Sequence, residues 1–159
     1  MISQFNERQK FGQWWLWLLL VGIGVFPAIG IYKQLILKEE FGSKPMSDGG
    51  LITFSLIIAA VIVLFGILRL ETTIDHTGIR MRYFPFVRKN VSWQTIESVN
   101  VIDYGFVGGW GIRLWTSYGT VYNVSGSKGL AIQLKNGKKF LIGTQKPTEL
   151  DAFLKKIKS

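Results

Sequence analysis

The sequence predicts a membrane α-helical hairpin followed by a small, mainly-β domain that ends in an α-helix. Three observations carry this prediction. Two apolar runs near the N-terminus contain no charged side chain, and short β-type segments separated by turn residues follow them. The last part of the chain carries an apolar stripe at helical spacing.

The two apolar runs, residues 14–32 and 51–68, are predicted to be transmembrane helices. As helices they are about 28 and 27 Å long, and a bilayer core is roughly 30 Å thick. An isolated strand in hydrocarbon leaves its backbone groups unpaired, so helix is the expected state. The tryptophans at positions 14, 15 and 17 suit the interfacial start of a retained helix, while a cleaved secretory signal is the alternative interpretation.

The spans divide the chain into an N-terminal tail (1–13), a first helix (14–32), a loop (33–50), a second helix (51–68) and a β-domain (70–159). The tail carries Arg8 and Lys10, and five basic residues follow the second run before position 90. The loop has only three lysines. Basic residues are retained on the cytoplasmic side, so we expect a multi-pass protein of the cell membrane with both termini cytoplasmic and the loop extracytoplasmic.

The net charge of +9 lies almost entirely in the β-domain, because residues 69–159 hold 14 basic and 6 acidic side chains. A basic domain tethered to the bilayer is attracted to anionic phospholipid headgroups. Nucleic acid is also polyanionic, but the sequence has no recognisable nucleic-acid fold motif. We therefore expect lipid, and no nucleic acid, among the partners.

The residue inventory argues against an enzyme. The chain has no cysteine and a single histidine, His76, in a predicted turn. A Ser–His pair, a thiolate nucleophile and a multi-histidine metal site therefore lack their residues. The run from Gly126 to Gly129 lacks the spacing of a phosphate loop. We expect no catalytic residue, no metal and no cofactor.

Turn residues recur every eight to twelve positions in the β-domain, a pattern typical of a small sandwich or barrel. Strands are predicted at residues 72–75, 79–84, 87–93, 98–104, 112–116, 121–124, 130–134 and 140–142. Asn136-Gly137 between alternating apolar residues is the clearest hairpin signal. A terminal helix from about Pro147 to Ile157 places Leu150 and Phe153 on one apolar face, which we expect to close one end of the β-structure.

Two stretches resemble bacterial pleckstrin-homology-like (PH-like) membrane proteins. They are the run from Gly108 to Arg113 (GGWGIR) and the run from Leu134 to Pro147 (LKNGKKFLIGTQKP). The resemblance covers about residues 10 to 157. It implies a bacterial inner-membrane protein in which two N-terminal helices precede a PH-like β-barrel capped by the C-terminal helix. It implies no activity, because it carries over no shared catalytic residues.

A basic hairpin is the first candidate contact site. Arg80 and Arg82 are two residues apart and share one strand face. Arg88 and Lys89 lie on the returning strand, with Phe84 and Phe86 at the tip. Such a tip can place rings in a membrane interface and guanidinium groups on phosphates. The alternative, which we favour, is a solvated basic face with its aromatic residues folded into the barrel.

The glycine-rich segment around Trp110 is the second candidate. Its exposed backbone and indole could bind a peptide or a lipid headgroup, with Arg113 beside them. The structural alternative is a bulge that wraps the barrel and buries the indole, with Arg113 capping it. We favour the structural account.

These observations lead to one functional hypothesis and one alternative. The first is a non-enzymatic integral membrane protein whose cytoplasmic PH-like domain is a docking module for a protein partner, anionic lipid or a second copy of itself. The alternative is an accessory or assembly subunit of a membrane complex, recognised through its two transmembrane helices.

Overall fold

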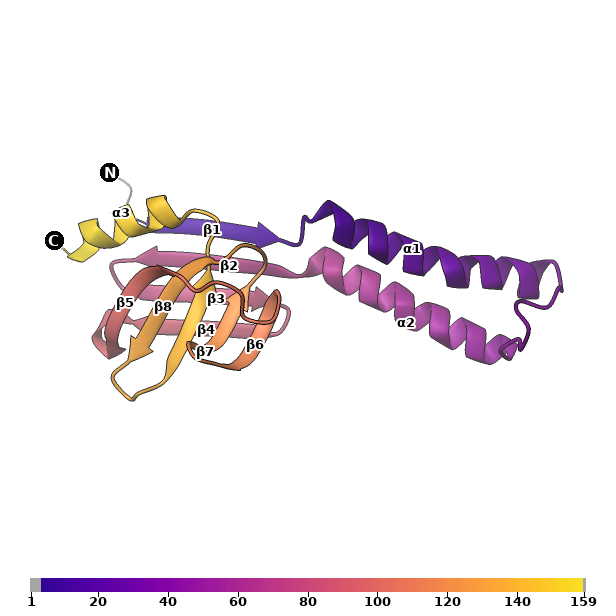
Figure 1. Cartoon of the computed structure of the whole chain (residues 1–159). Helices are drawn as coiled ribbons and strands as arrows, with labels where there is room; N and C mark the ends of the chain where they lie inside the picture. Colours follow the sequence, from indigo (N-terminus) through magenta and orange to yellow (C-terminus); the bar gives the residue numbers. More distant parts are fainter. Residues whose placement is uncertain (1–3, 159) are drawn as a thin grey trace. The chain divides into compact units, whose positions relative to one another are not determined.

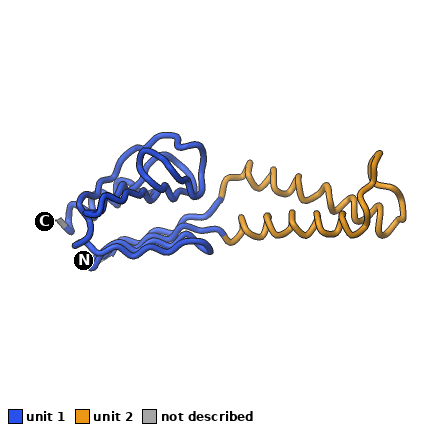
Figure 2. The backbone as a smooth tube through the Cα atoms, turned by 90° about the horizontal axis from the view of Figure 1, so that it is seen from below, with its two compact units in different colours: residues 1–11, 68–159 blue, residues 12–67 orange. Residues whose placement is uncertain are grey.

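The computed structural model describes residues 4–158 and separates into two compact units (Figure 2). One unit, residues 12–67, is helical. The other combines the start of the chain, through Phe11, with everything from Leu68 onward. The β-domain is therefore built from both sides of the helical segment in the sequence.

The helical unit contains two long apolar helices. Helix α1 (Trp14–Ile31) continues into a π-helical turn, η1 (Tyr32–Ile36), and α2 spans Asp48–Ile67. Both are long and apolar enough to cross a membrane. In the most apolar stretch of α1 with η1, only 17% of the residues are buried, and in that of α2 only 6% are. The core helix of a soluble protein, in contrast, is mostly buried.

The second helix begins three residues earlier than predicted, and a serine cap accounts for the difference. The Ser47 hydroxyl accepts a hydrogen bond from the Gly50 backbone N–H at 3.2 Å, and Asp48 lies in the first turn. Both features favour a helix N-terminus. Farther along, a Cβ atom at Gly24 would lie 2.9 Å from the Ile62 side chain, so the glycine permits close packing of α1 on α2.

The β-domain consists of nine strands and a C-terminal helix within the described residues (Figure 1). The strands are β1 (Gln4–Lys10), β2 (Arg69–Asp75), β3 (Gly78–Phe84), β4 (Val87–Ser92), β5 (Ile96–Asp103), β6 (Gly111–Thr116), β7 (Gly119–Asn123), β8 (Lys128–Leu134) and β9 (Lys139–Gly143). A 3-10 turn, η2 (Trp93–Thr95), joins β4 to β5, and α3 spans Pro147–Lys158.

The strands form two separate sheets. The prediction of a barrel is wrong, because no closed barrel is found among the described residues. Sheet A has the order β1-β2-β3-β4 and sheet B the order β5-β8-β9-β7-β6. The break falls at η2, which separates β4, at one edge of sheet A, from β5, at one edge of sheet B. The other edge of sheet A is taken by β1, which the sequence did not reveal as a strand. The two sheets pack face to face, with their strands crossing (Figure 1).

Alternation along the strands supplies the core between the sheets. Sheet A buries Phe5, Leu70, Ile74, Ile79, Met81 and Tyr83, and sheet B buries Val99, Leu130, Ile132, Phe140 and Ile142. The predicted terminal helix is confirmed together with its apolar stripe. Leu150 and Phe153 are buried, and the Phe153 ring centroid lies 6.2 Å from that of Phe5.

Strand β1 is the main departure from the sequence prediction, which placed these residues in an N-terminal tail. It pairs antiparallel with β2 along its whole length, from Gln4 opposite Asp75 to Lys10 opposite Arg69. Its residues are alternately exposed and buried. The sequence does not indicate this strand, because two of its three buried residues are polar and the alternation is therefore not one of apolar and polar residues.

Those two buried polar residues connect sheet A to the last residue of β9 and to the segment that follows it. The Glu7 carboxylate accepts hydrogen bonds from the Thr144 hydroxyl at 2.6 Å and from the Gln145 backbone N–H at 2.7 Å. The Gln9 side-chain amide donates to the Gly143 carbonyl at 2.7 Å. Hydrogen bonds to a buried carboxylate are among the stronger ones, so β1 is fixed to both sheets.

Two turns in sheet B depend on glycine. The predicted Asn136-Gly137 hairpin is confirmed, with Gly137 at a φ of 82° between β8 and β9. Gly119 begins β7 at a φ of 79°, and a Cβ atom there would lie 2.1 Å from the Lys139 carbonyl oxygen. This glycine therefore permits the close approach of β7 to β9, which pair in parallel.

Replacing Glu7 with alanine should destabilise the β-domain by about 2 kcal/mol, because a buried hydroxyl and a part-buried backbone N–H lose their acceptor. The matched control is Asn6→Ala, a change at the neighbouring exposed position of the same strand, which should cost less than about 0.5 kcal/mol. Urea unfolding of the full chain in detergent micelles, followed by β-sheet circular dichroism, measures both. Equal effects of the two changes would contradict the role assigned to Glu7.

Candidate functional site

The outward face of sheet A gathers positive charge. We call its six cationic side chains the basic face: Arg8, Lys10, Arg69, Arg80, Arg82 and Arg88. The only acidic side chains on the same described face are Glu71 and Asp75. Strands β1 to β4 all contribute, because alternation turns every second residue of each strand outward.

The row of the sheet that contains Lys10, Arg69 and Phe84 lies at the end where β1 finishes and β2 begins. The Arg69 guanidinium carbon lies 4.5 Å from the Phe84 ring centroid, and that of Arg82 lies 4.7 Å from it. Guanidinium groups stack favourably on aromatic rings. The ring therefore holds two arginines at this end of the basic face.

The next row contains Arg8, Glu71, Arg82 and Arg88. Glu71 lies 3.4 Å from the Arg8 side chain and 2.9 Å from that of Arg69, so it serves two cations. Arg82 and Arg88 are direct cross-strand partners, and neither forms an ion pair within residues 4–158. Like charges placed directly opposite each other in a sheet are destabilising.

Farther from that end, Arg80 forms an ion pair with Asp75. The Asp75 carboxylate also accepts hydrogen bonds from the hydroxyl and the backbone N–H of Thr77 in the β2–β3 turn. The two Thr77 hydrogen bonds, and to a smaller extent the Arg80 charge, hold the pKa of Asp75 below its usual value of 3.8. Arg80 is therefore partly compensated, unlike Arg82 and Arg88.

The structure brings together four of the residues singled out in the hairpin, Arg80, Arg82, Phe84 and Arg88, on one face. Phe84 lies under two guanidinium groups, while Phe86 in the β3–β4 turn is 58% exposed. Lys89 does not belong to this face. Its ammonium lies 5.0 Å from the Phe140 ring centroid on the inner side of the sheet, because adjacent strand residues point to opposite faces.

Sequence reasoning missed three members of the basic face. Arg8 and Lys10 belong to the unexpected strand β1, and Arg69 begins β2 three residues before the predicted strand. From the sequence alone, Arg8 and Lys10 are expected only as charges that flank a membrane span. The signal available in the sequence was the two-residue spacing of cations, at 8 and 10 as at 80 and 82.

Trp110 and Arg113 form a separate cluster on sheet B. The Arg113 guanidinium donates to the Trp110 carbonyl at 2.8 Å. A Cβ atom at Gly109 would lie 2.6 Å from this guanidinium group, so the glycine leaves room for it. The half-buried Trp110 indole donates to the Gly126 carbonyl at 3.4 Å. Asn123 accepts from the Gly111 N–H at 2.9 Å. These contacts fix the glycine-rich segment to the end of β7.

This cluster reaches the end of β3 through Tyr83. The Tyr83 hydroxyl donates to the Asn123 carbonyl at 3.3 Å, and the Tyr83 and Tyr122 ring centroids are 6.4 Å apart. Burial raises the pKa of Tyr83 to about 12, and the nearby Arg113 charge offsets part of that rise. The start of β6 and the Phe84 end of the basic face are therefore neighbours within the domain.

Strand β6, an edge strand of sheet B, contains a β-bulge that sequence reasoning did not single out. Arg113 pairs with Val121 and Thr116 with Gly119, so Leu114 and Trp115 together oppose one residue of β7. Trp115 is 94% exposed and Leu114 53% exposed. Trp115 has a φ of 55°, a left-handed conformation that costs a non-glycine residue about 1–2 kcal/mol.

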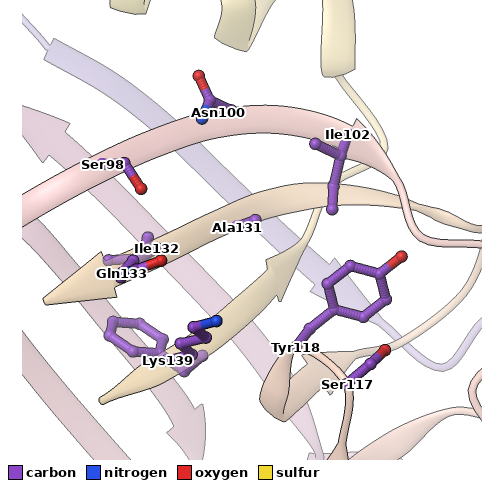
Figure 3. Close-up of a pocket in the computed structure, with 10 residues that line it drawn as sticks. Ser98, Asn100, Ile102, Ser117, Tyr118, Ala131, Ile132, Gln133 and Lys139 are labelled. Carbon is purple, nitrogen blue, oxygen red and sulfur yellow. The ribbon is translucent and has the colours of Figure 1, made fainter. Parts of the chain in front are cut away.

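The outer face of sheet B carries a hollow of about 290 Å³ (Figure 3). Ala131 forms part of its floor, and Tyr118 stands at one side. Ser98, Asn100, Ser117, Gln133 and Lys139 supply polar groups around it. Lys139 is the single charged residue among those that line it, so the hollow offers hydrogen bonds but no acid–base pair.

Within residues 4–158, no group of three or more His, Cys, Asp or Glu side chains is placed to hold a metal ion. No protein-family model matches the chain, and no curated protein matches its sequence.

Replacing Asp75 with asparagine should lower the melting temperature most at neutral pH. A carboxyl whose pKa is lowered by folding stabilises the fold above its unfolded value of 3.8, and this contribution disappears as the pH falls through the lowered folded-state pKa. The difference between the wild type and Asp75→Asn should therefore shrink from pH 7 to pH 2. Thr77→Ala, which removes the largest cause of the shift, should show the same trend. A difference that is constant with pH would contradict this account.

Proposed function

We propose that this chain is a non-enzymatic integral membrane protein, of the bacterial PH-like type, whose β-domain is a docking module. The two apolar helices anchor it, and the basic face of sheet A binds the headgroups of anionic phospholipids. The observation that carries the proposal is the cross-strand pair of Arg82 and Arg88, which lacks an acidic partner among the described residues. A phosphate between two such guanidinium groups relieves their repulsion and accepts charge-assisted hydrogen bonds.

Anionic lipid is favoured over a protein partner or a second copy because of the chain connections. Lys10 precedes the first residue of α1, Trp14, by four positions, and Arg69 follows the last residue of α2, Ile67, by two. If the helices cross a bilayer, connections this short keep the nearest end of the basic face at its surface. Five of the six cations lie in the two rows at that end.

The pairing of β1 with β2 supports the orientation that the charges suggest. These strands precede α1 and follow α2, yet they lie side by side in one sheet. Two helices that each cross the membrane return the chain to the side of the membrane on which it began. The pairing of β1 with β2 requires this, because both strands must be on the same side. The excess of lysine and arginine on that side assigns it to the cytoplasm.

Removing the charges of Arg82 and Arg88 should abolish preferential contact of the domain with anionic lipid. The chain has no cysteine, so Asn90→Cys gives a unique spin-label site on the same exposed face. In nanodiscs containing phosphatidylglycerol, the label should be at least twofold less accessible to an aqueous nickel relaxation agent than in phosphatidylcholine. The double change Arg82→Gln and Arg88→Gln should remove that difference, and added salt should weaken it.

The charge-matched control is Lys135→Gln with Lys138→Gln, two exposed positions in the turn between β8 and β9, and it should leave the lipid preference intact. Equal protection in neutral and anionic nanodiscs, or equal loss in both double variants, would overturn the proposal. The arginine variant should melt close to the wild type, because the loss of a repulsive pair and the loss of the Arg82–Phe84 stacking act in opposite directions.

The proposed orientation predicts the compartment of two reporters. A reporter fused after Ser159 should register as cytoplasmic, and one inserted in the connection at residues 40–44 should register as extracytoplasmic. The physical reason is the retention of basic flanks on the cytoplasmic side. Paired alkaline phosphatase and fluorescent protein fusions measure both sites. An extracytoplasmic signal from the terminal fusion would refute the assignment.

A further inference from the structure

The bulge of β6 holds two large apolar side chains outside the fold. Trp115 and Leu114 are 94% and 53% exposed, and the bulge places both against a single residue of β7. Trp115 has a left-handed φ of 55°, which tryptophan rarely adopts. Neither the exposure of this side chain nor its backbone conformation stabilises the isolated domain.

The shape of the β6 edge argues against a partner that adds a strand. An exposed edge strand pairs with another chain through its free backbone groups. A bulge interrupts the regular spacing of those groups and twists the edge away, which is one way in which proteins block such pairing. The exposed features here are therefore the side chains rather than the backbone edge.

The part of the sequence that forms β6 to β9 carries cations and no acidic side chain, which suits an anionic surface. No aspartate or glutamate occurs from residue 104 to residue 148, a stretch that includes β6 to β9, and six lysines and arginines do. Arg113 directly precedes the bulge. Tryptophan and leucine beside cations, without acidic neighbours in sequence, are the combination that partitions into the headgroup region of a bilayer.

The bulge also belongs to the appropriate end of the domain. The start of β6 lies against Tyr83 through Asn123 and Arg113, and Tyr83 adjoins Phe84 in the end row of the basic face. Figure 1 shows β6 toward the end of the β-domain at which β1 finishes and β2 begins. The strand that carries the bulge therefore lies at the same end of the domain as the uncompensated cations.

We infer that Leu114 and Trp115 form an interfacial anchor that inserts into the headgroup region of the bilayer to which the chain is tethered. The anchor adds an apolar contact to the electrostatic one. It rests on the proposed function in one respect, since the helices must cross that bilayer. The lipid is contacted through its interface rather than through a particular headgroup, so the anchor works in neutral membranes as well.

A spin label close to the bulge tests this inference in the full chain. Ser117→Cys gives an exposed label site two residues beyond Trp115, and His76→Cys gives an exposed reference site in the β2–β3 turn, at the opposite end of sheet A from Arg69 and Phe84. In phosphatidylcholine nanodiscs, the label at 117 should be several-fold less accessible to aqueous nickel, and more accessible to oxygen, than the label at 76. Trp115→Gln should bring the two sites to equal accessibility, and Trp115→Phe should preserve the difference.

Other results would overturn the inference. Equal accessibility at both sites in the parent chain means that the bulge stays in water. Protection at 117 that survives Trp115→Gln means that the tryptophan is not the anchor. Protection that falls when each nanodisc carries a single copy of the chain identifies a second copy, not lipid, as the occupant. An unchanged melting temperature verifies that Trp115→Gln leaves the fold intact.

The outcomes separate this inference from the proposed function. If Trp115→Gln changes nothing while the Arg82 and Arg88 double variant still abolishes the preference for anionic lipid, the anchor fails and the basic face stands. If the label at 117 is protected equally in neutral and anionic nanodiscs and depends on Trp115, the anchor stands whatever the arginines do.

Discussion

The pairing of β1 with β2 is the constraint on which the other features depend. Seven residues before the helical unit align with seven residues directly after it, and Glu7 and Gln9 fix the first strand to the segment that follows β9. The helical segment is thus an insertion between two neighbouring strands of one sheet.

The same pairing determines how charge is distributed on the domain. Without β1, Glu71 would have Arg69 as its cationic neighbour and sheet A would end at β2. With β1 in place, Arg8 shares the Glu71 carboxylate, and Lys10 extends the end row. The acid is occupied at this point, so Arg82 and Arg88 in the same row are left without a counter-ion among the described residues. Compensation on the β1 and β2 side of the sheet leaves the positive charge of Arg82 and Arg88, on β3 and β4, uncompensated.

Much of the secondary structure could be predicted from the sequence, because it follows local rules. The apolar runs, the Asn136-Gly137 hairpin and the stripe of α3 each depend on residues close together in the chain. The division into two sheets could not be predicted, because it depends on which distant strands become neighbours, as in the parallel pair of β7 and β9. Strand β1 was missed because its buried positions carry Glu7 and Gln9, whose partners lie more than 130 residues away.

The candidate site shows the same division between local and distant information. The two-residue spacing of Arg80 and Arg82 correctly indicated a shared face. The assignment of Lys89 to that face was wrong, because neighbouring residues of a strand point to opposite sides of the sheet and Arg88 already occupies the outer side.

Covalent attachment reduces the entropic cost of membrane contact, so a domain anchored in this way needs only a modest interaction to adopt one orientation. Each uncompensated cation near an anionic surface contributes about 1 kcal/mol, but only within a Debye length of roughly 8 Å. Charge therefore fixes the orientation of the domain only where a short-range contact, such as that of an exposed tryptophan, holds the cations within this distance of the membrane surface.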